Sequence, residues 1–248
     1  MIILFSPSET KTINSTYKFI DEKSFIFPEM FTKRKKVLEI YQNFIKNADL
    51  NQKIKLFGIK DKKLLKELKN INIFDDLTEK AILRYSGVGY KYLKYRTLHQ
   101  DAKHFIDNHL LIFSNLFGVI QAKDKIPFYK LKQGEKIEDF CFEKYYKNEF
   151  SNILDNYLKD KLIVDLRASF YEKQYKPKKE YITFKFLKNQ KVVSHWAKAY
   201  RGIVARKIAI NKVKDEEDLM NINFKTLKII DIKQIKNKKE YLFEIIDK

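Results

Sequence analysis

The chain has 248 residues and a formal net charge of +19, from 51 Lys or Arg residues against 32 Asp or Glu residues. Its content of 44% hydrophobic and 15% aromatic residues excludes an intrinsically disordered chain, and its single cysteine, Cys141, excludes an intrachain disulfide. No stretch has the apolar length needed to cross a bilayer, and residues 1–11 lack the basic segment of a signal peptide, so we expect a cytoplasmic protein that binds no membrane.

The N-terminal part predicts a buried strand followed by helices. Residues 1–5 are apolar and lead into the polar turn 6–11, SPSETK. A strand that ends in Ser, Thr and Lys is a common way to build an anion site, and it is also how ordinary strands end. Pro28 predicts the start of a helix of about twenty residues. Two shorter helices are expected at 49–57 and 60–70.

A glycine pair follows the next predicted strand, residues 81–85. Gly87 and Gly89 flank Val88, and this arrangement lets the backbone turn tightly and point amide N–H groups outward. Hairpins between helices grip DNA phosphates in this way, although the same tripeptide occurs in any tight turn. Lys91 and the neighbouring tyrosines favour the nucleic-acid interpretation.

The middle of the chain alternates between predicted helices and strands. We expect a helix at 101–109, a strand at 110–113, a turn into a short helix at 114–120 and an extended segment at 126–131. His99, His104 and His109 are spaced by five residues, so they do not share a helix face. We therefore expect no histidine metal site and no cofactor.

The C-terminal half predicts a long helix at 137–158, a central strand at 162–166, a hairpin at 181–196 and a strand pair at 227–232 and 241–246. The chain contains no internal repeat, Pro/Gly/Ser linker, Walker loop or Gly-x-Gly-x-x-Gly fingerprint. The expected fold is one mixed α/β domain over residues 1–248, with a mixed, partly antiparallel sheet flanked by helices.

Positive charge is concentrated in one segment. Residues 166–214 hold fourteen Lys or Arg residues and two Glu residues, a net charge of +12 out of the total of +19. Only six of the chain's basic residues are Arg, and a composition rich in Lys, Ile and Asn can arise from codon bias. Uniform bias would not cluster the charge, so this segment indicates a polyanionic partner.

The basic segment includes a predicted helix at 194–212. At 100° per residue, Lys198, Arg201 and Lys212 share one arc, and the small residues between them, Gly202 among them, would let an anionic backbone approach. The opposite arc is apolar. An ordinary amphipathic helix with a basic exposed side would show the same pattern.

Six motifs in order resemble the YaaA-type peroxide-stress resistance family of bacterial cytoplasmic proteins. They comprise the first strand with Ser6-Pro7-Ser8-Glu9-Thr10-Lys11, Gly87 with Tyr90 and Leu93, Leu116-Phe117-Gly118-Val119-Ile120, Tyr129-Lys130-Leu131 with Gly134, Leu166 with Tyr171 and Lys173, and Ala197-Lys198 with Arg201-Gly202 and Arg206.

The resemblance implies a DNA-binding protein of the oxidative-stress response, with a mixed α/β fold, a positively charged cleft and a helix-hairpin-helix element. Family members are linked to lowering free iron and limiting Fenton damage to DNA. The expected nucleic-acid-binding residues are Lys11, Gly87, Gly89, Lys91, Tyr129, Lys130, Tyr171, Lys173, Lys198, Arg201, Gly202, Arg206 and Lys212.

This chain departs from the family pattern in three turns. Gly87-Val88-Gly89-Tyr90 stands where many members read Gly-Asp-Val-Tyr, and Tyr129-Lys130-Leu131-Lys132 stands where they read Tyr-Arg-Leu-Glu. Asp165-Leu166-Arg167-Ala168 replaces Asn-Leu-Ala-Ser. The acid of the first turn is therefore absent here.

Three functions stay open on sequence grounds. The first is DNA binding without strict sequence preference. The second is an enzyme acting on a nucleotide or phosphorylated substrate, with Lys11, Lys198, Arg201 and Arg206 converging near Tyr171, although no general base is recognisable. The third is direct iron binding, which one cysteine and four scattered histidines disfavour, so we name no catalytic residue and no metal ligand.

Overall fold

A mixed sheet organises the part of the chain that the computed structural model describes, which is residues 1–59, 65, 68, 71–193 and 196–246. The strands lie in the order β4-β3-β1-β6-β7-β10-β9, and β8 pairs with β7 outside this path. Their bounds are β1 (Ile2–Phe5), β3 (Leu110–Ser114), β4 (Gly118–Gln121), β6 (Ile163–Asp165), β7 (Tyr181–Lys188), β8 (Lys191–Val192), β9 (Leu227–Ile235) and β10 (Lys238–Ile245). A separate antiparallel pair consists of β2 (Thr78–Lys80) and β5 (Lys125–Pro127).

The centre of the sheet is parallel and its edges are antiparallel. β1 pairs in parallel with β3 on one side and with β6 on the other, and β7 pairs in parallel with both β6 and β10. β4 and β9 run antiparallel to their neighbours. Every residue of β1 and β3 is buried. Such unbroken apolar runs are typical of parallel strands that are covered on both faces.

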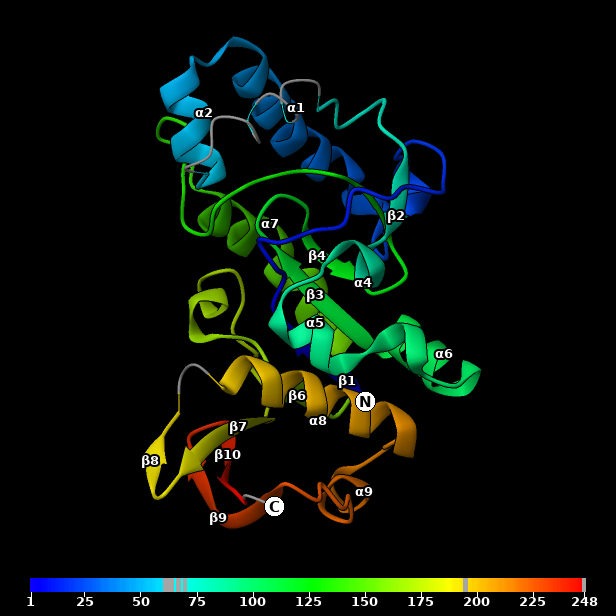
Figure 1. The fold of residues 1–248 in the computed structure, drawn as a ribbon, viewed down its shortest axis with the longest axis vertical. Helices are drawn as coiled ribbons and strands as arrows, with labels where there is room; N and C mark the ends of the chain where they lie inside the picture. Colours follow the sequence, from blue (N-terminus) through cyan, green and yellow to red (C-terminus); the bar gives the residue numbers. More distant parts are fainter. Residues whose placement is uncertain (60–64, 66–67, 69–70, 194–195, 247–248) are drawn as a thin grey trace.

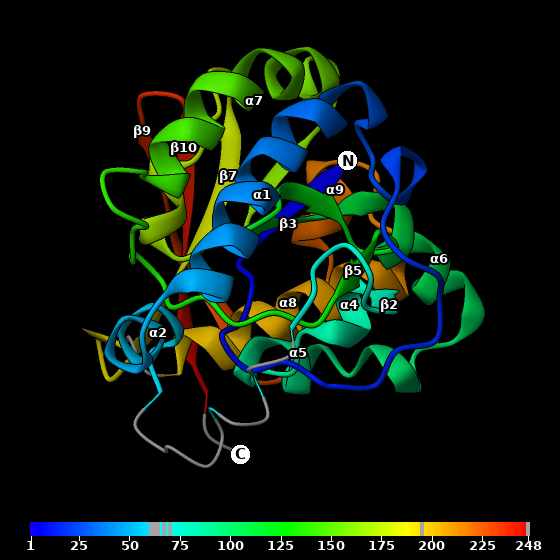
Figure 2. The same ribbon diagram turned by 90° about the horizontal axis from the view of Figure 1, so that it is seen from above.

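Helices cover both faces of this sheet (Figures 1 and 2). Figure 1 shows α5 and α8 crossing in front of β1 and β6, whereas α7 lies behind the sheet and contacts β4. The bounds are α1 (Phe31–Asn47), α2 (Leu50–Phe57), α4 (Ala81–Arg84), α5 (Val88–Leu93), α6 (Gln100–His109), α7 (Phe142–Leu158), α8 (Ala197–Asn211) and α9 (Glu216–Met220). A 3-10 segment, η4, spans Ser169–Lys173.

Helix α8 is packed on two sides, against the sheet and against α5. Val204 and Ile208 are fully buried, and so are the small residues Ala205 and Ala209. Small side chains let two helix backbones approach closely. Consequently α8 is fixed along most of its length, and the basic residues of its first turn have defined positions.

The expected mixed α/β fold with a partly antiparallel sheet is confirmed. The helix after Pro28, the helices near 49–57 and 101–109, and the strands near 1–5, 110–113 and 162–166 all form. The final strand pair and the hairpin that begins at residue 181 also form, although β8 has only two residues. The helix expected at 60–70 lies almost wholly outside the described residues.

Three local expectations are wrong. Residues 81–84 form the single helical turn α4 and not a strand, because a short apolar run fits either a buried strand or a buried helical turn. Residues 114–120 make a hairpin into β4, with Gly118 at φ +68°. The helix expected from 137 begins at Phe142, after a tight turn that places Glu138 at φ +52°.

The expected helix-hairpin-helix element is not confirmed. α4 has four residues and ends at Arg84, so it provides only one turn before the glycine pair. Gly87 then acts as the N-terminal cap residue of α5 with extended backbone dihedrals. Gly89 lies inside α5 itself, and the two glycines therefore open a helix.

Candidate functional site

A pocket of about 300 Å³ lies at the carboxyl ends of β1 and β6. The chain leaves β1 toward β3 on one side and leaves β6 toward β7 on the other, so these neighbouring strands form a topological switch point. Open α/β sheets bind ligands in the crevice at such points. We call this cavity the switch-point pocket, and its lining comprises Phe5, Ser6, Pro7, Ser8, Glu9, Thr10, Gly87, Val88, Gly89, Tyr90, Gln133, Leu166, Ala168, Tyr171, Lys198 and Arg201.

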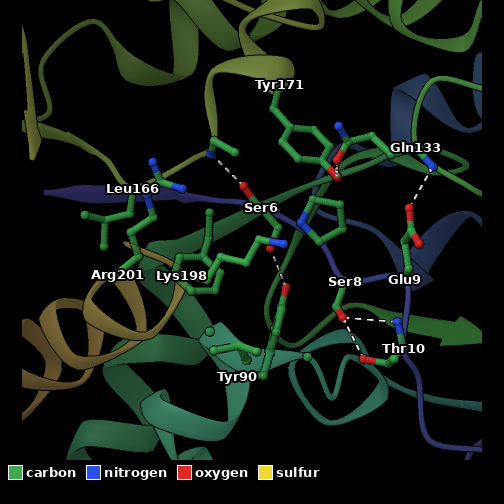
Figure 3. Close-up of a pocket in the computed structure, with 16 residues that line it drawn as sticks. Ser6, Ser8, Glu9, Thr10, Tyr90, Gln133, Leu166, Tyr171, Lys198 and Arg201 are labelled. Carbon is green, nitrogen blue, oxygen red and sulfur yellow. Dashed lines mark hydrogen bonds between the residues drawn. The ribbon is translucent and has the colours of Figure 1, made fainter. Parts of the chain in front are cut away.

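The loop after β1 forms one wall of the pocket (Figure 3). The Ala168 N–H donates to Ser6 Oγ at 2.8 Å, which ties this loop to the loop after β6. The Tyr90 hydroxyl donates to the Ser6 carbonyl at 2.9 Å, which ties it to α5. Ser8 Oγ and Thr10 Oγ1 lie 3.0 Å apart at the pocket edge. This wall is therefore held on both sides and carries several hydroxyl groups.

A second wall combines Glu9, Gln133 and Tyr171. The Gln133 N–H donates to Glu9 Oε1 at 3.1 Å, and the Tyr171 hydroxyl donates to Gln133 Oε1 at 3.3 Å. These bonds connect the β1 loop, the segment after β5 and η4 across the pocket. Burial raises the pKa of Tyr171, so its hydroxyl remains a neutral hydrogen-bond group.

Two cations from the first turn of α8 enter the same pocket. Lys198 and Arg201 are three residues apart and therefore share one helix face. Figure 3 shows both side chains pointing toward the loop that carries Ser6. Among the described residues, neither side chain forms a hydrogen bond or an ion pair. Burial lowers the pKa of Arg201, which shows how little water surrounds its guanidinium.

The nearest buried carboxylate does not neutralise these cations, because it is paired elsewhere. Asp165 at the end of β6 accepts from Arg167 Nε at 2.9 Å and from Arg167 Nη2 at 2.6 Å. The Arg167 guanidinium also lies 4.1 Å from the centre of the Phe113 ring. With Asp165 held in this two-bond pair, the positive charge of Lys198 and Arg201 has no matched partner and favours an anionic ligand.

Comparison with known proteins supports a family assignment. A family model described as "Peroxide stress protein YaaA" matches residues 1–231. The chain belongs to the YaaA family of peroxide stress proteins. An uncharacterized protein of Campylobacter jejuni is 48% identical over 248 residues, which is 100% of both chains. A UPF0246 protein of Corynebacterium glutamicum is 33% identical and covers 90% of this chain and 91% of its own.

The switch-point pocket brings together five of the residues selected from the sequence of this YaaA-family chain, namely Gly87, Gly89, Tyr171, Lys198 and Arg201. The two glycines are needed for close approach. A Cβ atom on Gly87 would lie 2.2 Å from Ser8 Oγ, and one on Gly89 would lie 3.2 Å from the Phe5 ring. Their role in binding a nucleic acid stays a prediction.

Lys11, Tyr129 and Lys130 form a neighbouring cluster and do not line the pocket. Lys11 Nζ donates to the Ser8 carbonyl at 2.9 Å and lies 4.0 Å from the centre of the Tyr129 ring. Tyr129 is buried, and Lys130 Nζ donates to the Glu9 carbonyl at 3.3 Å. These three residues therefore support the wall of the pocket from behind.

Three residues of α8 that were selected with Lys198 and Arg201 have structural partners. Arg206 Nη1 donates to the carbonyls of Leu93 and Lys94 at 3.0 and 2.9 Å, which closes the end of α5. Lys212 pairs with Asp101 at 2.6 Å. Gly202 is buried, and a Cβ atom there would lie 2.1 Å from the carbonyl oxygen of Gly89.

The burial of Gly202 corrects the interpretation of its helix. The small residues of α8 do not leave space for an anionic backbone, because α5 fills that space. Lys91 is exposed on α5, and Lys173 lies over the Phe170 ring beside a different hollow. The basic residues of segment 166–214 therefore do not converge on one point.

Sequence reasoning identified the turn 6–11 but did not single out Glu9 or Gln133. Glu9 stood in a polar turn whose Ser and Lys residues attracted attention, and it provides the carboxylate that lines the pocket. Gln133 follows β5 in an irregular segment with no motif. Its place across from Tyr171 depends on long-range packing, so no local signal could have selected it.

Metal and membrane sites were also sought in the structure. Within residues 1–59, 65, 68, 71–193 and 196–246, no group of three or more His, Cys, Asp or Glu residues could hold a metal ion. No helix in that part of the chain is both long and apolar enough to cross a membrane.

Proposed function

We propose that this YaaA-family protein binds DNA without strict sequence preference and holds a backbone phosphate in the switch-point pocket against Lys198 and Arg201. The observation that carries the proposal is the pair of cations that enter this pocket with no carboxylate partner among the described residues. An anion is the ligand that such a pair favours. Phosphate contacts supply affinity that does not depend on base sequence.

The surroundings of the pocket add donors of the right kind. The first N–H groups of α5 follow Gly87, and no side chain caps them. Backbone N–H groups at helix starts are common phosphate donors. Ser8 and Thr10 bring hydroxyl groups to the same edge. The net charge of +19 would attract a polyanion over distances longer than any of these contacts.

The proposal is tested by fluorescence anisotropy of labelled duplex, single-stranded and junction DNA over a series of KCl concentrations. On duplex DNA, log K should fall by roughly 0.9 per phosphate contacted for each unit of log salt. Lys198→Ala and Arg201→Ala should each weaken binding and make the salt dependence less steep. Lys212→Ala is the matched control, because Lys212 lies at the other end of α8 and is paired with Asp101. Affinity that stays constant with salt would contradict DNA binding.

A second candidate is an enzyme or binding protein for a nucleotide or a small phosphorylated compound. The size of the pocket favours it, because about 300 Å³ is the volume of a small-ligand site. Phe5, Pro7 and Val88 add apolar surface beside the two cations. Glu9 is the carboxylate that could move a proton there.

Calorimetric titration with nucleoside monophosphates and with inorganic phosphate distinguishes the two candidates. Stoichiometric binding that Arg201→Gln abolishes, together with DNA affinity that this variant leaves unchanged, would support the small-ligand function. The opposite pattern, with DNA affinity lost and no nucleotide binding by the unmodified protein, would support DNA as the ligand.

A further inference from the structure

The amine of Lys11 has unusual surroundings. It donates to the Ser8 carbonyl at 2.9 Å and to the Glu9 carbonyl at 3.5 Å. Aromatic rings lie beside it, with the ring centres of Tyr129 at 4.0 Å and Tyr85 at 5.4 Å. Its backbone is fixed by a bridge to Tyr85. Thus the amine is anchored by the same loop that lines the switch-point pocket.

No acid neutralises this amine, although two other cations act on it. Among the described residues, Lys11 forms no ion pair with a carboxylate. Lys130 and Arg84 both disfavour its charged form, and only the Glu9 carboxylate opposes them from a distance. Tyr85 and Tyr129 hydrogen-bond to each other at 2.8 Å, and burial keeps both phenols neutral.

Loss of hydration is the main cause of the resulting acidity. Burial, assisted by the neighbouring cations, lowers the pKa of Lys11 to about 7. The aromatic rings attract an ammonium by only about 0.5 to 2 kcal/mol, which does not replace the lost water. Near neutral pH a large fraction of this amine is therefore unprotonated and carries a free electron pair. Ordinary lysines at the same pH are almost fully protonated.

We propose that Lys11 is a nucleophilic lysine that forms an imine with an aldehyde group of a ligand bound in the switch-point pocket. Lys11 itself is partly exposed, and Ser8 and Glu9, which hold its amine, both line that pocket. Lys198 and Arg201 enter the pocket from α8, while Ser8 and Glu9 come from the β1 loop (Figure 3). The ligand class is therefore a phosphorylated aldehyde, and its phosphate rests on the proposed function.

The covalent step needs no oxidant or reductant. The neutral amine attacks the carbonyl carbon, a C–N bond forms, and the carbonyl oxygen takes up a proton to give a carbinolamine. Loss of the hydroxyl group as water then yields the protonated imine. Hydrolysis reverses the step, so a lysine of this kind can hold an aldehyde transiently.

Trapping with cyanoborohydride tests the inference on the full-length protein. Glyceraldehyde 3-phosphate, unphosphorylated glyceraldehyde and a duplex oligonucleotide with one abasic site serve as probes, and peptide mapping locates the adducts. At pH 7 we expect Lys11 to be captured faster than exposed lysines by on the order of tenfold or more. Capture should rise through pH 7. The better substrate among the phosphorylated arms identifies the source of the aldehyde.

Variants and outcomes separate this inference from the proposed function. Lys11→Arg should lose the adduct, and the matched neighbour Lys130→Arg should keep it. The mapping on unmodified protein decides the matter even if Lys11→Arg folds poorly: adducts distributed according to exposure, with Lys11 no faster than other lysines, would overturn the inference. Equal capture of both glyceraldehydes at Lys11 would keep the nucleophile and remove the phosphate contact of the proposed function.

Discussion

Two buried charges near the pocket show how single residues set the properties of this protein. Asp165 and Arg167 form a two-bond pair in which the arginine side chain is almost fully buried. That pair keeps Asp165 from neutralising Arg201, so the charge of the pocket depends on it. Asp124 is buried without an ion pair and accepts instead from the N–H groups of Ile26 and Gln121.

The Asp165–Arg167 pair should be critical for stability. Asp165→Asn leaves the Arg167 guanidinium buried without its counter-charge, and breaking a buried pair in this way costs about 3 to 5 kcal/mol. Urea denaturation measures the change in the free energy of unfolding. Asp231→Asn is the control, since Asp231 and Lys233 form an exposed pair at 3.7 Å, and we expect a change below about 1 kcal/mol. Equal effects would show that the buried pair is not special.

Asp124 should make stability depend on pH. Burial raises the pKa of its carboxyl to about 6, although two backbone N–H groups, Arg34 and Lys123 oppose the shift. The folded pKa exceeds the unfolded value, so this residue's contribution is full below about pH 4 and is lost as pH rises through 6. The loss amounts to at most about 3 kcal/mol.

Asp124→Asn tests this origin of the pH dependence. The amide oxygen can still accept from Ile26 and Gln121, but it carries no charge at any pH. The variant should therefore unfold with a higher free energy at pH 7 and with a flatter profile between pH 4 and 7. Urea denaturation at several pH values measures both. An unchanged profile would mean that other groups cause the dependence.

Close packing at the scale of whole elements positions the pocket. α5 and α8 approach so closely that the backbone of one fills the position of a side chain on the other, at Gly89 and Gly202. Arg206 closes the end of α5 from the same helix. Because α5 carries Gly87 and α8 carries Lys198, this contact sets the width of the pocket.

Gly202→Ala should separate α5 from α8. A helical Gly-to-Ala change usually gains up to about 1 kcal/mol, but the new Cβ atom would lie 2.1 Å from the Gly89 carbonyl oxygen. We expect the clash to dominate and to destabilise the protein by about 1 to 3 kcal/mol. Thermal unfolding measures this loss. Ile210→Ala on the exposed end of α8 is the control and should change stability little. A more stable Gly202→Ala protein would contradict the packing.

At the scale of the whole molecule, the last strand of the chain lies inside the sheet. β10 is between β7 and β9, although it spans residues 238–245. Tyr241 and Phe243 are buried and pack against Phe184 of β7. The strand is therefore part of the core.

A chain that ends at residue 226 should fail to fold. It would lack β9 and β10 and would expose the edge of β7 together with its aromatic residues, which is a site for aggregation. Solubility and far-ultraviolet circular dichroism of the shortened chain measure this. A soluble, cooperatively melting product would show that the hairpin is dispensable.

The sequence alone determined most of the fold and the location of the positive charge. Continuous apolar runs specify buried strands at 1–5, 110–113 and 162–166, because only a strand covered on both faces has no polar side. The capping signals around Pro28 likewise specify a helix. The ambiguous segments were short, such as 81–85 and 114–120, where one turn of helix and one short strand bury the same residues.

Only the tertiary structure decided which charges act together. Lys198, Arg201 and Tyr171 meet Ser6 and Glu9 because β1 and β6 become neighbours, and no local pattern encodes this adjacency. Gly202 appeared to make room for a ligand, but α5 fills that room, since close helix packing and anion binding both require small residues. The pKa of Lys11 depends on burial by segments more than seventy residues away, and the chain order alone cannot specify that environment.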